Sequence, residues 1–209
     1  MSSDSNPSSP KPHPGHNDND TSCVAACDKQ KVHDNRMDRP PYSLSDKNKD
    51  SKALYTGTCF CEKVKYEIFR DKPLDAKFCH CPTCQKLHGA PFQWAAIFHK
   101  TDVHFTQGED QLIYFHPGEK SQEYILPCKI SCKFCRTPIM DEGRNMLLLY
   151  PTLIDFGKDN KKKRDFYPSC HIFYSRRCVD VVDGLPKFAK HKDESETIPE
   201  TLREDGHDD

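Results

Sequence analysis

Three cysteines within six residues constrain this chain more than any other feature. They are Cys79, Cys81 and Cys84, in the stretch FCHCPTCQKLHG. Residues at i and i+2 of an extended chain point to the same side, so Cys79 and Cys81 can face one point. Pro82 can begin a helical turn that brings Cys84 round to that point. Because a disulfide at i,i+2 would be badly strained, the spacing predicts three ligands of a tetrahedral zinc site.

The fourth corner of this site is not filled by a fourth cysteine close to the other three. The residues that could fill it are Cys128, His80, His88 and His171. We expect Cys128 and Cys178 to be small buried hydrophobic residues rather than ligands, and we expect no ligand role for Cys170 and His171, which lie at the head of a strand. If no protein group fills the corner, the zinc is catalytic or ligand-binding. Three thiolates leave zinc with a formal charge of −1, which favours holding a thiol as thiolate over generating hydroxide.

Four further cysteines form two close pairs. Cys59 and Cys61 form a C-x-C after Gly57, and Cys132 and Cys135 form a C-x2-C between two expected strands. Tight turns at such spacings present two thiolates to one metal. Together the pairs predict a complete four-cysteine site that is saturated, and therefore structural. Cys23 and Cys27 are also close together, but no other ligand lies near them.

The middle of the chain has the pattern of short β-strands with little helix. Val64, Tyr66 and Ile68 alternate with charged residues, as in a half-buried strand. Other expected strands are Phe92 to Phe98 (with Trp94, Ala96 and Phe98 on one face), Val103 to Phe105, Leu112 to Phe115, Glu123 to Leu126, Met146 to Tyr150 and Ile172 to Tyr174. Helix is expected only after Pro82 and near Pro186. This pattern predicts an all-β, antiparallel domain.

Composition divides the 209 residues into a domain and two tails. Residues 1–50 are rich in Pro, Ser, Asn and Asp and are expected to be disordered, as is the acidic segment 191–209. The domain, 51–190, carries 22 basic and 16 acidic residues, which suits a small anionic ligand. The lysine run at Lys161 to Arg164 is expected to be a solvated loop, and nothing else predicts a nucleic-acid face.

The N-terminus has no apolar segment of the signal-peptide type, and no apolar run reaches membrane-spanning length. We therefore expect a cytoplasmic protein, with a nuclear location as the alternative, in a compartment where cysteines at metal spacing bind zinc.

Four segments together resemble the glutathione-dependent formaldehyde-activating (GFA) family, which includes the domain of centromere protein V. They are GTCFCEKVKYEI, FCHCPTCQKLHGAPF, SCKFCRTPI and CHIFYSRRCVDVVDGLPKF, and they extend from about Leu54 to Phe188. The resemblance implies a β-tent fold and two Zn²⁺ per chain. It places the structural zinc on the first and third motifs and the catalytic zinc on Cys79, Cys81 and Cys84. It also implies a carbon–sulfur lyase that joins glutathione and formaldehyde or splits their adduct.

Two positions depart from the family pattern. Glu62 and Arg136 stand where a glycine usually follows the second cysteine of each structural pair. Such turns favour glycine where φ is positive, so we expect distorted turns at both places.

Three functions are compatible with the sequence. The first is a thiol–aldehyde enzyme in which His88 or His171 supplies or accepts the proton. The second is a zinc module that binds glutathione or a protein partner without turnover, and the acidic tail suits such binding. The third is chromatin or microtubule association, as the likeness to centromere protein V suggests, although the chain lacks a dense basic tract.

Overall fold

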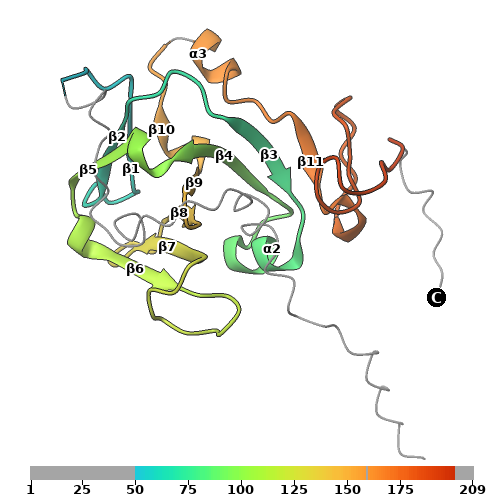
Figure 1. Cartoon of the computed structure of the whole chain (residues 1–209), viewed down its shortest axis with the longest axis horizontal. Coiled ribbons are helices and arrows are strands. Elements are labelled where there is room, and N and C mark those ends of the chain that lie inside the picture. The colour runs from blue at the N-terminus through green and yellow to red at the C-terminus, as the bar shows by residue number, and fades with distance from the viewer. Residues whose placement is uncertain (1–49, 159, 201–209) are drawn as a thin grey trace, which may run out of the picture.

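The chain folds around two β-sheets that share one core. The computed structural model describes residues 50–158 and 160–200. The four-stranded sheet has the order β10-β1-β2-β5 and the seven-stranded sheet the order β11-β3-β4-β9-β8-β7-β6 (Figure 1). The first sheet contains β1 (Tyr55–Thr58), β2 (Lys65–Ile68), β5 (Val103–Gln107) and β10 (Ile154–Asp155). The second contains β3 (Asp75–Cys79), β4 (Gln93–His99), β6 (Leu112–Phe115), β7 (Cys128–Cys132), β8 (Pro138–Glu142), β9 (Met146–Leu149) and β11 (Cys170–Ile172).

These strands confirm the predicted all-β class, since the structure is 36% strand and 15% helix. The expected strands appear as β2, β4, β5, β6, β9 and β11. The prediction of a strand at Glu123 to Leu126 is wrong, because this segment forms no strand. The strand expected to run to Tyr174 ends at Ile172, since Phe173 takes a left-handed conformation with φ of 55°. The domain is also not wholly antiparallel, because β11 pairs with β3 in parallel.

The helices are short. They are α2 (Pro82–His88), α3 (Asn160–Arg164) and the 3-10 turns η2 (Lys100–Asp102), η3 (Glu109–Gln111), η4 (Pro151–Leu153) and η5 (Tyr174–Arg176). The helical turn predicted after Pro82 is α2. The lysine run expected to be a loop forms α3 instead, and the segment around Pro186, expected to be helical, is extended and accepts a hydrogen bond from the backbone N–H of His171. Within the described ranges, no helix has the length and apolar character needed to cross a membrane.

The core lies where the two sheets pack together. Tyr66 and Ile68 of β2 are buried in one cluster with Phe98 of β4 and Leu149 of β9. The predicted alternation in β2 is present, because its apolar residues are buried and its charged ones are partly exposed. Trp94, which was expected on the buried face of β4, is only partly buried. The middle residues of β4 are buried on both faces, because Ala96 and Phe98 pack in the main core and Ala95 and Ile97 pack with Leu148 in a second cluster.

Residues 191–200 make defined contacts with the domain, contrary to the expectation of a disordered segment. The backbone N–H of Ile198 donates to the carbonyl of Lys187 at 2.7 Å, and that of Ala189 donates to Glu196 at 2.9 Å. In Figure 1 this C-terminal segment lies beside β11, on the far side of the molecule from β5 and β6. The proposed domain boundary at residue 191 therefore falls at the start of a segment that contacts the domain. The remaining residues of the N-terminal and C-terminal tails lie outside the described ranges.

Candidate metal centres and the adjoining pocket

The three-cysteine cluster consists of Cys79, Cys81 and Cys84, which meet where β3 passes into α2. Cys79 ends β3, and Cys81 caps α2, since its sulfur accepts the backbone N–H of Cys84 at 3.3 Å. Pro82 is the first helical residue, as its fixed φ favours. The Sγ atoms of Cys79 and Cys84 are 3.6 Å apart, and all three side chains are buried. The structure thus brings these three predicted ligands to one point.

The four-cysteine cluster consists of Cys59, Cys61, Cys132 and Cys135, and it joins the two sheets. Its first pair lies in the turn between β1 and β2, and its second lies at the turn between β7 and β8. The Sγ atom of Cys61 is 3.5 Å from that of Cys59 and 3.8 Å from that of Cys132. Thr137 ties the turns further, because its side-chain oxygen accepts the backbone N–H of Phe60 at 3.2 Å.

The turns at Glu62 and Arg136 keep the left-handed conformation despite lacking glycine. Glu62 has φ of 58° and Arg136 has φ of 62°. Each donates its backbone N–H to the carbonyl of the first cysteine of its pair, at 2.9 Å to Cys59 and 3.0 Å to Cys132. The prediction of distorted turns is therefore wrong. Glu62 and Arg136 adopt a left-handed backbone conformation that costs about 1–2 kcal/mol for a residue with a Cβ.

The donor sets suit zinc. With Zn–S bonds of about 2.3 Å, a tetrahedral site separates its sulfur atoms by roughly 3.8 Å. The Sγ atoms are 3.5 Å apart in Cys59 and Cys61, 3.8 Å in Cys61 and Cys132, and 3.6 Å in Cys79 and Cys84. A disulfide would require about 2.05 Å, and none of the described cysteines forms a disulfide. The ligand atoms of each cluster lie within 4.8 Å of one another. Both clusters could therefore hold metal ions.

No other predicted ligand joins the three-cysteine cluster among the residues that the structure describes. Cys128 belongs to the core between the sheets, where burial raises the pKa of its thiol, so it is the buried hydrophobic residue that was expected. Cys170 is buried beside the cluster with Ile172. Cys178 is exposed, so its expected burial is wrong. Cys23 and Cys27 lie outside the described residues.

The histidines that were candidate ligands have other partners. Nε2 of His80 lies 2.8 Å from Nδ1 of His171, whose Nε2 lies 2.9 Å from a carboxylate oxygen of Asp183. Both rings are buried. Burial and the neighbouring His171 lower the pKa of His80 to about 3, and burial lowers the pKa of His171. The ring of His88 packs edge-on against Tyr150, at 5.0 Å between centroids.

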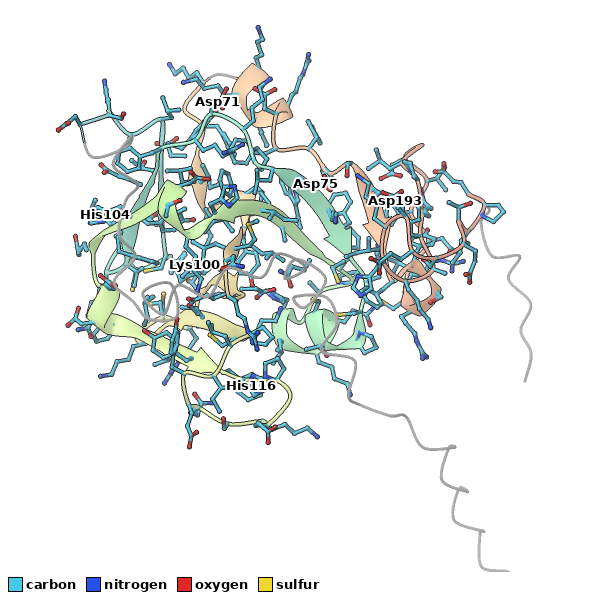
Figure 2. All side chains as sticks on the ribbon, in the orientation of Figure 1. Asp71, Asp75, Lys100, His104, His116 and Asp193 are labelled. Atoms are coloured by element: carbon cyan, nitrogen blue, oxygen red, sulfur yellow. The ribbon has the colours of Figure 1, made fainter. Side chains whose placement is uncertain are left out.

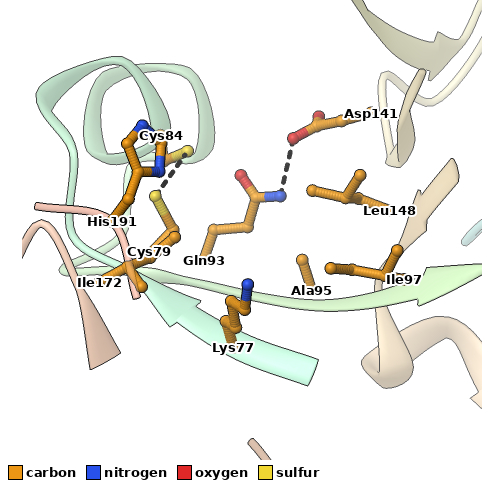
Figure 3. A pocket seen from close by; sticks show the side chains of 10 residues that line it. All are labelled: Lys77, Cys79, Cys84, Gln93, Ala95, Ile97, Asp141, Leu148, Ile172 and His191. Carbon is orange, nitrogen blue, oxygen red and sulfur yellow. Dashed lines mark hydrogen bonds between the residues drawn. The ribbon is translucent and has the colours of Figure 1, made fainter. Parts of the chain in front are cut away.

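A pocket adjoins the three-cysteine cluster (Figure 3). Cys79 and Cys84 form one side of it, and Gln93 and Asp141 lie across from them, joined by a hydrogen bond of 2.9 Å. The remaining lining residues are Lys77, Ala95, Ile97, Leu148, Ile172 and His191. The cavity measures about 50 Å³, which accommodates a few water molecules or a small organic group.

The sequence reasoning missed the polar side of this pocket. Gln93 and Asp141 lie in β4 and β8, and Lys129 of β7 reaches both of them. The signal for these residues was present, because a lysine and an acidic residue interrupt otherwise apolar strand segments, and polar groups in such places are buried only when paired.

Comparisons with known proteins identify one family that matches this chain. The model of the family described as glutathione-dependent formaldehyde-activating enzyme matches residues 54–176, more than half of the chain. No curated protein matches the chain. Among solved structures, the crystal structure of a Rhodobacter sphaeroides protein is similar, with 18% identity and a TM-score of 0.40 over 51% of this chain and 93% of that one. The chain belongs to the family of glutathione-dependent formaldehyde-activating enzymes.

Proposed function

We propose that this protein is a zinc-dependent carbon–sulfur lyase that forms or cleaves a thiol–aldehyde adduct such as S-hydroxymethylglutathione. The observation that carries the proposal is the cluster of three buried cysteines with no fourth ligand among the described residues, open to a pocket on one side. Three protein ligands with one free position are typical of catalytic zinc sites, whereas four are typical of structural ones. The four-cysteine cluster accordingly takes the structural role.

The three-cysteine cluster and the adjoining pocket suit different substrates. When bound, a zinc ion at Cys79, Cys81 and Cys84 supplies a Lewis acid that favours the thiolate form of an incoming sulfur. The pocket beside Cys79 and Cys84 is too small for a tripeptide but has room for a formaldehyde-sized aldehyde. We infer that the aldehyde occupies this pocket and that the body of the thiol lies outside it.

The outer side of the pocket suits an anionic thiol. Lys77 and His191 line it and are partly exposed, so they can contact a ligand that approaches from solvent. Glutathione carries two carboxylates, which a lysine can pair with at such a rim. A cluster of metal-binding thiols persists where thiols are kept reduced, so we propose the cytoplasm as the compartment.

His171 is a poor candidate for the proton carrier of this reaction. It is fully buried and engaged with His80 and Asp183, and it does not line the pocket. His88 does not line it either, whereas Asp141 does. The buried polar side chains that line the pocket are therefore Gln93 and Asp141, with Lys77 and His191 partly exposed beside them.

The test is the rate of adduct formation from glutathione and formaldehyde with zinc-loaded protein. We expect turnover above the uncatalysed rate, and its loss in Cys81→Ser. Cys178→Ser is the matched control, because Cys178 is exposed and outside both clusters, and it should keep full activity. Thiol binding by calorimetry with no turnover would contradict the lyase and favour a zinc module that only binds the thiol.

A further inference from the structure

A buried ion pair lies directly beside the three-cysteine cluster. Nζ of Lys129 is 2.6 Å from Oδ2 of Asp141, and their side chains are 8% and 1% exposed. The same ammonium donates to Oε1 of Gln93 at 3.1 Å and to Sγ of Cys84 at 3.7 Å. A lysine ammonium has three donors in fixed tetrahedral directions. Here the Lys129 ammonium contacts the carboxylate of Asp141, the side-chain amide of Gln93 and the sulfur of Cys84, one of the predicted metal ligands.

Neighbouring groups hold the carboxylate of this pair in place. Gln93 donates to Oδ2 of Asp141 at 2.9 Å, and the hydroxyl of Tyr150 donates to Oδ1 at 2.5 Å. Burial and the nearby Asp141 raise the pKa of Tyr150 well above its usual range, so this hydroxyl keeps its proton and remains a donor. The pair is therefore an oriented dipole whose positive end faces the sulfur of Cys84.

We propose that Lys129, fixed by Asp141 and Gln93, is a positioning residue that donates an N–H···S hydrogen bond to Cys84 and so stabilises the negative charge of the three-cysteine cluster when a metal is bound. This inference rests on the proposed function in so far as that function requires a metal at the cluster. Lys129 itself is neither a predicted metal ligand nor a lining residue of the pocket.

The physical reason is the charge of the cluster. Three thiolates around a divalent cation carry a formal −1, and a fourth sulfur anion raises this to −2. In a buried site, such charge is costly unless a cation or donor faces it. Hydrogen-bond partners of metal ligands typically account for 10- to 100-fold in metal affinity or activity. We expect that range for Lys129.

The first experiment measures zinc affinity by competition with a chelator in Lys129→Met/Asp141→Asn. Removing both charges avoids leaving one buried charge without its partner, which would destabilise the fold. We expect zinc at the three-cysteine cluster to bind 10- to 100-fold more weakly, with the four-cysteine cluster unchanged.

A second buried pair provides the matched control. Nζ of Lys100 is 2.7 Å from a carboxylate oxygen of Glu142, with side chains 1% and 0% exposed. Figure 2 shows Lys100 within the body of the molecule. Neither residue belongs to a cysteine cluster or lines the pocket. Lys100→Met/Glu142→Gln should therefore leave zinc affinity at both clusters unchanged, which separates the loss of the N–H···S contact from the loss of a buried pair.

The outcomes are distinguishable. Equal zinc affinity in wild type and Lys129→Met/Asp141→Asn overturns this inference alone. Wild-type protein that holds zinc at the three-cysteine cluster but shows no turnover overturns the proposed function alone. Wild-type protein that binds no zinc there overturns both.

A spectroscopic measurement on the wild type covers the case in which the double variant does not fold. In protein loaded with cadmium-113, the ammonium protons of Lys129 should show a through-bond coupling to the metal by way of Cys84. Loaded protein without that coupling overturns the inference. Fluorescence of the single tryptophan, Trp94, reports whether each variant is folded.

Discussion

His171 shows how a single side chain can be tied to the fold from both sides of its ring. One nitrogen contacts His80 and the other contacts Asp183, and the ring has no exposed surface. The sequence could suggest His171 as a ligand because of its residue type. It could not reveal the pairing with His80, since the two lie 91 residues apart and meet only because β11 pairs in parallel with β3.

This burial predicts a pH dependence. Because burial lowers the pKa of His171, the ring is neutral in the folded protein, whereas in the unfolded chain it titrates near 6.5. Its contribution to stability is therefore present above about pH 6.5 and is lost as the pH falls below that value. The unfolding free energy should decrease with falling pH, by up to about 1.4 kcal/mol per pH unit for this one proton.

Urea denaturation of wild type and His171→Gln at several pH values from 5.5 to 7.5 measures this effect. Below pH 6.5, the unfolding free energy of the variant should decrease less steeply than that of wild type. Above pH 7, this histidine should cause no pH dependence in either protein. Parallel curves for the two proteins would contradict a neutral, buried His171.

At the scale of elements, the pairing of β1 with β2 depends on a glycine. Gly57 lies opposite Tyr66 in the register of the two strands, and the Tyr66 ring covers the place where a Cβ at residue 57 would be. Tyr66 is 1% exposed, so its ring has little freedom to move away. The sequence indicated β2 by its alternation, but it did not predict β1, which is short and carries this glycine.

Gly57→Ala should lower the unfolding free energy by about 1–3 kcal/mol, the usual range for overpacking a buried site. Denaturant titration followed by Trp94 fluorescence gives the value. Thr56→Ala is the control in the same strand, because Thr56 is exposed, and it should change stability by less than about 0.5 kcal/mol. Equal effects of the two substitutions would show that the Tyr66 ring does not occupy this space.

The other strands also differ in whether their sequence pattern predicts them. Strands with clear alternation or long apolar runs, such as β2, β4 and β9, could be predicted from the sequence. β7 and β8 were missed because a lysine in β7 and two acidic residues in β8 break their apolar pattern. Lys129 pairs with Asp141 across the two strands and Glu142 pairs with Lys100, and local periodicity carries no information about such partners.

At the scale of the whole molecule, the two clusters differ in what they hold together. Cys61 and Cys132 are 71 residues apart; Cys61 lies in the turn between β1 and β2 of the four-stranded sheet, and Cys132 ends β7 of the seven-stranded sheet. Cys79 and Cys84, in contrast, are 5 residues apart in one segment. The spacing of the cysteines was sufficient to predict both groups. It could not predict the pocket, whose lining comes from several strands and from His191.

Loss of the four-cysteine cluster should therefore destabilise the protein more than loss of the three-cysteine cluster. By analogy with a covalent cross-link, closing a loop of about 70 residues stabilises by about 4 kcal/mol, and closing one of about 5 residues by about 2 kcal/mol. Thermal unfolding of zinc-loaded Cys132→Ser and Cys81→Ser tests this order. A larger drop in Tm for Cys81→Ser would contradict the structural role of the four-cysteine cluster.

The most direct test of the central claim is the zinc content per chain, measured by elemental analysis with and without glutathione on wild type and Cys81→Ser. The claim of one structural and one catalytic metal predicts two zinc ions in wild type and one in the variant. One zinc ion in both proteins would mean that the three-cysteine cluster does not retain metal, and it would contradict the proposed lyase mechanism.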